Sequence, residues 1–397
     1  MAITKNKIKA YALKNAIAYQ GKANPGAIVS GLFAEGLEKN KIKDFMPKIQ
    51  EVIKEISKLS LEEQKKEFEK LKSETSEREV REGLPELPHG EKGVVMRIAP
   101  SPSGPLHLMH AINLSLNYLY VQKYGGTLYV RIEDTNPENI YPKAYNMIKK
   151  EAIWLTDEST KIIIQSERMH LYYKYAEELL DKESAYVCSC SPENFRELAK
   201  QKKNCPCRKK SKIENLEDWG LMMQGKLDNV VLRFKSDMKH KNPAMRDFPL
   251  ARINKTPHPL QKRKYNVWPL MNLAVSVDDI ELEMTHIIRG KDHRDNAERQ
   301  KLIYKVLGKQ YPWSAFTGMT NFIGMKFSTR QMRQDIEDKK KSGWDDPTLP
   351  TVASLKKRGY KPIAFQRFAE HTGNLSEVDK TIKKEDFFKI FDEFNKN

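Results

Sequence analysis

The first hydrophobic pattern in the chain is helical. Between residues 46 and 59, apolar side chains recur at three- and four-residue steps, the spacing of one face of an amphipathic helix. Ser60 and Glu63 then form a capping-box signature, which predicts that a second helix begins there. The segment 83–93, GLPELPHGEKG, contains three glycines and two prolines and predicts a linker. We therefore expect residues 1–90 to form an N-terminal helical extension.

The pattern after this segment alternates between short apolar runs and helical stretches. VVMRIA (94–99) predicts a buried strand, and a helix is expected from about residue 107 to 123. GGTLYVRIEDT (125–135) predicts a turn and a second strand, and KIIIQS (161–166) predicts a third. Strand–helix–strand order of this kind predicts a parallel α/β sheet, which binds ligands at the carboxyl ends of its strands.

The alternation is interrupted by a basic region that contains every cysteine, and it resumes near residue 267. After about residue 315 we expect a smaller, mostly helical region. Its tail, DFFKIFDEF (386–394), has the pattern of an aromatic amphipathic helix.

Length and charge narrow the class of protein. A chain of 397 residues suggests two or three domains. The formal net charge of +17 favours a polyanionic partner, although a lysine-rich proteome would give the same excess. The N-terminus lacks the apolar run of a signal peptide, and no segment approaches the roughly 18 apolar residues of a membrane span. We therefore expect an intracellular, cytoplasmic protein with no membrane partner.

The four cysteines form one local cluster, Cys-x-Cys, fourteen residues, Cys-x-Cys. Four soft ligands at this spacing predict a tetrahedral zinc site, with free thiols or an oxidised pair as alternatives. The residues are Cys188, Cys190, Cys205 and Cys207. Basic side chains surround them and could grip phosphates, or could simply be solvated. They are Lys200, Lys202, Lys203, Arg208, Lys209, Lys210 and Lys212.

The stretch 96–111, MRIAPSPSGPLHLMHA, holds the most unusual chemistry. Its three prolines end the first strand, and Gly104 would let a backbone pass close to a ligand. The helix that follows begins with free amide groups, which favour phosphate. His107 and His110 lie three residues apart, share one face, and could stabilise a phosphate as charge develops on it. A metal site, or histidines with only capping or core roles, would be the alternatives.

These residues carry a family resemblance. HLMH (107–110) after a proline- and glycine-rich turn resembles the HIGH signature of class I aminoacyl-tRNA synthetases. Further segments make the chain similar to glutamyl-tRNA synthetases of the archaeal/eukaryotic type, as far as about residue 360. They are RIAPSPSGPLH, GGTLYVRIEDTNPE, YVCSC, RDFPLARI, VDDIELEMTHIIRGKDH and SGWDDP.

The resemblance implies an α/β fold, a Rossmann-like parallel sheet of the class I synthetase type with a zinc-containing insertion. It divides the chain after the N-terminal extension into four parts. These are 91–185 and 266–315 as the two halves of the catalytic domain, 186–265 as the zinc-stapled acceptor-end insertion, and 316–397 as the ATP-clamp loop with a helical stem-contact module.

The resemblance also implies residue roles. Arg97 and Arg289 would bind the carboxylates of glutamate, which needs bidentate arginines, and Glu133 would hold its ammonium. An ordinary salt bridge is the alternative for Arg97. Asp134 and Asp278 could be structural caps. The implied ATP-binding residues are Ser101, Gly104, His107, His110, Ser328, Thr329 and Arg330, of which His107, His110 and Arg330 would be catalytic.

Both ATP signatures depart from the family pattern. The mobile clamp loop, usually similar to LSTSK, is here GMKFSTRQMRQ (324–334), so Arg330 and Gln331 replace the final pair. Arg330 or Lys326 would then carry the positive charge toward the triphosphate. Met109 replaces the glycine against which adenine lies, and would crowd the nucleotide unless it points away or the ring shifts.

The expected function is attachment of glutamate to tRNA through glutamyl-adenylate, with ATP, Mg²⁺ and a structural Zn²⁺. Contact would be with the acceptor arm, because the many short strands of the family's anticodon-binding β-barrels are not found in this sequence. A separate chain or complex partner would then supply anticodon recognition. Two alternatives stay open: a truncated paralogue that glutamylates another acceptor, such as a modified tRNA base, and a non-catalytic tRNA-binding protein. Glutamine as the substrate is a lesser alternative.

Overall fold

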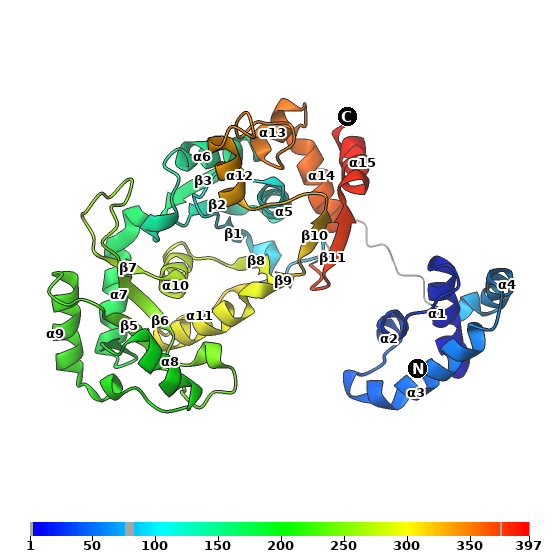
Figure 1. Cartoon of the computed structure of the whole chain (residues 1–397), viewed down its shortest axis with the longest axis horizontal. Helices are drawn as coiled ribbons and strands as arrows, with labels where there is room; N and C mark the ends of the chain where they lie inside the picture. The colour runs from blue at the N-terminus through cyan, green and yellow to red at the C-terminus, as the bar shows by residue number, and fades with distance from the viewer. Residues whose placement is uncertain (1–2, 76–82, 374, 397) are drawn as a thin grey trace. The chain divides into compact units, whose positions relative to one another are not determined.

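The structure is a computed structural model that describes residues 3–75, 83–373 and 375–396. Its contacts divide the chain into two compact units, Met1–Arg81 and Glu82–Asn397. Figure 1 draws both, with the smaller unit in blue. Among the described residues, no helix is both long and apolar enough to cross a membrane.

The smaller unit is helical around its own apolar core. Its helices are α1 (Lys5–Ala18), α2 (Pro25–Ala34), α3 (Ile42–Ile56) and α4 (Leu61–Leu71). Ile49, Val52 and Ile56 of α3 are buried in this core, as the periodicity predicts. The predicted capping box is confirmed, because the Ser60 side chain accepts from the backbone N–H of Glu63 and the Glu63 carboxylate accepts from that of Ser60.

The larger unit contains the predicted parallel sheet, with strand order β1-β2-β3. The strands are β1 (Val94–Ile98), β2 (Gly126–Ile132) and β3 (Thr160–Ile164), and helices α5 (Leu108–Tyr124) and α6 (Ala144–Leu155) connect them. Arg97 stands opposite Tyr129, near the carboxyl end of β1. A second parallel pair, β8 (His286–Gly290) and β9 (Trp313–Thr317), lies beside β1, because the N–H of Thr285 donates to the carbonyl of Val95 (3.1 Å).

A separate antiparallel sheet, in the order β4-β5-β6-β7, forms the middle of the chain. It is drawn mostly in green in Figure 1. The strands are β4 (Ala185–Cys188), β5 (Val231–Phe234), β6 (Pro249–Ile253) and β7 (Val267–Pro269). Helices α7 (Met169–Asp181), α8 (Pro192–Lys200), α9 (Lys212–Met223), α10 (Met271–Glu281) and α11 (Arg294–Val306) accompany it. The insertion was predicted to end at residue 265, whereas strand β7 continues its sheet to Pro269.

The C-terminal region contains α12 (Thr329–Glu337), α13 (Val352–Lys357), α14 (Pro362–Thr372) and α15 (Lys384–Asn395). A parallel pair, β10 (Thr320–Ile323) and β11 (Lys380–Lys383), accompanies these helices. The predicted aromatic helix is present as α15, and Phe387 and Phe391 are completely buried. These rings belong to the same core as Leu114 of α5 and Val130 of β2. Helices α13, α14 and α15 thus complete the core of the parallel sheet, whereas Met332 of α12 packs in a smaller separate cluster with Trp344 and Leu349.

The prediction of a linker at 83–93 is wrong. Leu87 is buried in the core of the larger unit, and its N–H donates to the hydroxyl of Tyr124 (3.0 Å). The carbonyl of Pro88 accepts from Nε2 of His286 (2.8 Å). The prolines and glycines give this segment an irregular backbone, while Leu84 and Leu87 anchor it to the core of the sheet domain.

Candidate active site

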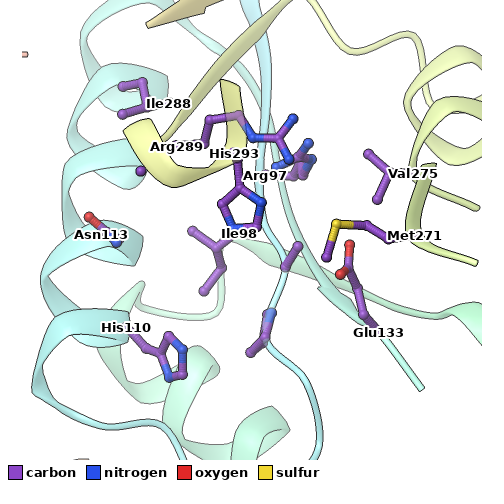
Figure 2. Close-up of a pocket in the computed structure, with 13 residues that line it drawn as sticks. Arg97, Ile98, His110, Asn113, Glu133, Met271, Val275, Ile288, Arg289 and His293 are labelled. Atoms are coloured by element: carbon purple, nitrogen blue, oxygen red, sulfur yellow. The ribbon is translucent and has the colours of Figure 1, made fainter. Parts of the chain in front are cut away.

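A pocket of about 210 Å³ opens at the carboxyl ends of the parallel strands. It brings together Arg97 from β1, Glu133 directly after β2, Arg289 from β8 and His110 from α5. Figure 2 shows the two guanidinium groups side by side, with Glu133 near Met271 and His110 on the opposite side. Four residues that sequence reasoning placed at a substrate site therefore share one cavity.

Arg289 is the cation with the fewest partners in this pocket. Its Nη1 donates to Oε1 of Gln300 (2.9 Å), while its buried Nε has no hydrogen-bond partner among the described residues. Burial and the positive charge of Arg97 both lower the pKa of Arg289. A buried, half-satisfied guanidinium beside a second one is stabilised by an anionic ligand.

Arg97 and Glu133 are both held by ion pairs as well as exposed to the pocket. Arg97 makes a two-point contact with Asp279, and Glu133 accepts from Arg131 (3.1 Å). The salt-bridge alternative for Arg97 therefore coexists with its place in the pocket lining.

Asp134 and Asp278 are buried in structural networks away from the pocket lining. The Asp134 carboxylate accepts from the N–H and hydroxyl of Ser166 (2.8 and 2.7 Å). Asp278 accepts from Nε of Arg168 (2.7 Å) and from the hydroxyl of Tyr172. These contacts fit the structural alternative that the sequence left open for both.

The two histidines stack at the start of α5. His107 is the N-cap residue, and its ring lies 3.7 Å from that of His110, centroid to centroid, nearly parallel to it. Burial lowers the pKa of His110 to about 4, and burial together with His110 lowers the pKa of His107. Both imidazoles are therefore neutral near pH 7, so the pair could offer a phosphate hydrogen-bond donors rather than cations. Only His110 lines the pocket itself.

The turn that carries His107 is fixed from two directions. The backbone N–H of Leu106 donates to Oε2 of Glu151 on α6 (2.7 Å). The carbonyl of Leu106 accepts from the N–H of Val352 (2.9 Å), and Leu108 N–H donates to the carbonyl of Pro350 (2.8 Å). Burial raises the pKa of Glu151 to about 8. Glu151 and the segment before α13 thus set the position of the histidine pair.

The clamp-like loop packs against this same turn. The ring of Phe327 meets that of His107 edge-on (5.4 Å between centroids). Ser328 is the N-cap of α12, and its side chain accepts from the N–H of Gln331. Arg330 and Lys326 are exposed on this loop. Two signatures separated by more than 200 residues are thus in contact.

Gly104 and Ser101 differ from their expected surroundings. A Cβ at Gly104 would collide with the methyl group of Thr329 and lie 2.9 Å from the Trp344 ring. The absent side chain therefore makes room for α12 and Trp344, and the role of Gly104 toward ATP stays a prediction. Ser101 is exposed in the turn and does not line the pocket.

Met109 points away from the arginine pocket. It lines a second, more apolar pocket with residues of β10 and α14, among them Phe322 and Phe368. Asn113, one turn further along α5, lines both pockets. The methionine therefore does not narrow the cavity that holds Arg97 and Arg289.

Sequence reasoning missed several residues of this site. His293, Asn113, Met271 and Val275 line the pocket. His293 follows Arg289 by four residues in RGKDH, a spacing that could have indicated it. The buried pair Arg131 and Asp279 gave no signal, because nothing in their local sequence reveals a contact across 148 positions.

The four cysteines meet as predicted. Their sulfur atoms all lie within 4.8 Å of one another, and none forms a disulfide. The contacts Cys188–Cys205, Cys190–Cys205 and Cys190–Cys207 measure 3.6, 3.4 and 3.8 Å. Tetrahedral zinc with Zn–S bonds of about 2.3 Å needs sulfurs about 3.8 Å apart. The cluster therefore fits a metal ion of this kind.

The basic residues around the cysteines fall into two groups. Arg208, Lys210 and Lys212 pair with Asp247, Asp218 and Asp181, each at 2.5 Å. The Arg208 and Lys210 pairs lie within the insertion, whereas Lys212 pairs with Asp181 at the end of α7. The remaining four are exposed, with no ion pair among the described residues: Lys200, Lys202, Lys203 and Lys209.

A parallel sheet with a histidine pair at the start of α5 and an arginine-lined pocket at its carboxyl edge is the architecture of a class I synthetase catalytic domain. Residues 93–393 match the family described as tRNA synthetases class I (E and Q), catalytic domain. Because the match covers more than half of the chain, the chain belongs to this family.

Individual relatives of the chain agree with this family assignment. The chain is 44% identical over 385 residues to the glutamate–tRNA ligase of Methanocaldococcus jannaschii, an alignment that covers 97% of this chain and 69% of that ligase. It is 40% identical to the glutamate–tRNA ligase of Methanopyrus kandleri, with coverage of 96% and 67%. A glutamate tRNA ligase from Elizabethkingia meningosepticum, crystallised with its amino acid, has a TM-score of 0.55 at 20% identity and covers 76% of this chain and 68% of that chain. That structural likeness shows the fold.

Proposed function

We propose that the chain attaches glutamate to tRNA in two steps. In the first, an oxygen of the glutamate α-carboxylate attacks the α-phosphorus of ATP, and pyrophosphate leaves. In the second, a ribose hydroxyl at the end of tRNA attacks the acyl carbon, and AMP leaves. Relatives that are similar along more than nine-tenths of the chain are glutamate–tRNA ligases by name.

The observation that carries this proposal is the charge of the pocket. Two guanidinium groups lie beside one carboxylate, and Arg289 lacks an acidic partner among the described residues. Glutamate brings two carboxylates and one ammonium, which matches two cations and one anion. A neutral side chain such as that of glutamine would leave one buried charge without compensation.

The signature residues serve the nucleotide. His107 and His110, as neutral donors, would stabilise the α-phosphate while it becomes five-coordinate. Ser328, Thr329 and the exposed Arg330 or Lys326 would hold the triphosphate from the clamp loop. Positioning and fixed charge then supply the catalysis.

Two metal ions fit this scheme. Magnesium would be bound mainly through the triphosphate and would neutralise its charge. Zinc on the four cysteines would order the insertion without taking part in the chemistry. The four free lysines of the insertion would contact phosphates of the tRNA acceptor arm. A cytoplasmic location and a partner that reads the anticodon stay predictions.

Transfer of labelled glutamate to total tRNA tests the proposal. The reaction contains ATP, with intact and periodate-oxidised tRNA in parallel. We expect base-labile label on intact tRNA only, because oxidation destroys the terminal ribose hydroxyls. Label on oxidised tRNA would instead indicate a base-modifying paralogue. No label on either, with tRNA still bound, would contradict catalysis.

A further inference from the structure

Four charged side chains beside the pocket are linked in a row by hydrogen bonds. Nε and Nη2 of Arg97 donate to the two carboxylate oxygens of Asp279, both at 3.0 Å. Nη1 of Arg131 donates to Oδ1 of the same Asp279 (2.5 Å). Nη2 of Arg131 then donates to Oε1 of Glu133 (3.1 Å). The order Arg97–Asp279–Arg131–Glu133 joins β1, α10, β2 and the end of β2.

The two middle members are hidden from the ligand. The side chains of Arg131 and Asp279 are 0% and 1% exposed, and neither lines the pocket. Both outer members, Arg97 and Glu133, line it. Burial alone would raise the pKa of Asp279, yet Arg97 and Arg131 lower it to about 2. The inner pair therefore stays ionised at every ordinary pH.

Stability alone does not account for this arrangement. Buried ion pairs contribute little net stability, since desolvation offsets most of their attraction, and well-packed apolar residues often serve as well. Here the buried pair instead fixes the orientation of two groups that face a cavity. Asp279 occupies two of the three nitrogens of Arg97 and leaves Nη1 for a ligand. Arg131 occupies one oxygen of Glu133 and leaves the other.

We infer that Asp279 and Arg131 are positioning residues for the amino acid. Asp279 holds the guanidinium that binds a carboxylate, and Arg131 holds the carboxylate that binds the ammonium. Because Asp279 and Arg131 also bind each other, one rigid connection sets the separation of the two binding groups. This inference rests on the proposed function, since it takes glutamate as the ligand.

The test measures binding of two probes to the full chain by calorimetry. L-glutamate carries both carboxylates and the ammonium, whereas glutarate lacks the ammonium. Arg131→Lys keeps a positive charge, but a single ammonium group cannot replace the two guanidinium nitrogens that donate to Asp279 and Glu133. We expect glutamate to bind about 10-fold more weakly and glutarate to change less than about 3-fold. Asp279→Asn loosens Arg97, so both probes should weaken about 10-fold or more.

Arg208→Lys is the matched control. Arg208 also pairs with a buried aspartate, Asp247, but lies in the insertion and does not line the pocket. This variant should bind both probes as the native chain does. ATP affinity should be unchanged in all three variants.

Two results would overturn the inference. One is a folded Arg131→Lys chain that binds glutamate as tightly as the native protein. The other is a parallel loss of glutamate, glutarate and ATP binding, which a merely structural role would produce. Should Arg131→Lys fail to fold, the double variant Arg131→Met with Asp279→Leu removes both buried charges together. It should keep ATP binding and lose at least about 10-fold in glutamate binding, and unchanged glutamate binding would overturn the inference.

Failure of the proposed function looks different. In that case the native chain itself binds no glutamate and charges no tRNA. The variants then cannot be compared with a native glutamate affinity, and the result contradicts glutamate as the substrate.

Discussion

The cysteine cluster and the arginine pocket are assembled in opposite ways. All four cysteines come from one stretch of twenty residues, and the spacing of that stretch sets the distances between their sulfur atoms. The pocket instead takes its groups from strands far apart, and Arg97 meets Asp279 across 182 positions. The first site is local to one insertion, whereas the second exists only when the whole sheet has formed. Damage to one should therefore leave the other functional.

The largest expected effect is on the pocket. Arg289→Gln removes the guanidinium that lacks an acidic partner among the described residues, so the KM for glutamate in tRNA charging should rise about 100-fold or more. The KM for ATP should stay within about 3-fold, because the residues proposed to bind the nucleotide are other ones. An equal rise in both constants would mean that Arg289 supports the whole site rather than the amino acid.

Loss of the cysteine cluster should affect stability before substrate binding. Cys205→Ser should abolish bound zinc, measured by atomic emission, and lower the melting temperature by several degrees. Ser189→Ala is the control, since its hydroxyl lies 3.6 Å from the Cys207 sulfur without being a ligand. Glutamate binding should survive in both. If Cys205→Ser also loses glutamate binding, the two sites are not independent.

The clamp loop should give a smaller, kinetic effect. Arg330→Ala should slow glutamate activation about 10-fold or more, while glutamate affinity changes little, because the residue would contact the triphosphate alone. Pyrophosphate exchange measures the first quantity and calorimetry the second. Lys326→Ala, made in parallel, shows which of these exposed cations carries the charge. If both variants exchange pyrophosphate at the native rate, the loop does not take part in glutamate activation.

The smallest effect on activity is expected for Glu151, whose influence is on the pH dependence of stability. Its pKa is raised from 4.5 to about 8, so the protonated form stabilises the fold fully below pH 4.5, and this contribution is lost as pH rises through about 8. Each pKa unit corresponds to about 1.4 kcal/mol, so the slope is measurable by urea unfolding at several pH values. Glu151→Gln stays neutral and should flatten this part of the profile. A slope that persists in the variant would mean that another group titrates there.

The sequence predicted the local elements and the parallel sheet well. Strand and helix patterns near 94–135 matched β1, α5 and β2, because periodicity reports directly which face of an element is buried. It does not report what covers that face. The shared core of α15 with α5, and the anchoring of Leu87, were therefore not predicted.

The residues of the candidate site likewise fall into those that local sequence motifs could indicate and those that only tertiary contacts reveal. Arg97, Glu133 and Arg289 could be named from motifs, and the structure brings them into one pocket. Asp279 could not be named, because a buried carboxylate in an apolar helix has no partner that can be seen locally. The packing of Thr329 against Gly104 could not be predicted for the same reason, since the two residues lie far apart in the sequence.

The most direct test of the central claim, that this pocket selects an acidic amino acid, is a competition. The chain receives tRNA, ATP and equal concentrations of glutamate and glutamine, each with a different label, and the two charged products are counted. Our account predicts a preference for glutamate of at least about 100-fold, because glutamine leaves the Arg289 guanidinium without an anion. Equal charging with both amino acids would contradict it.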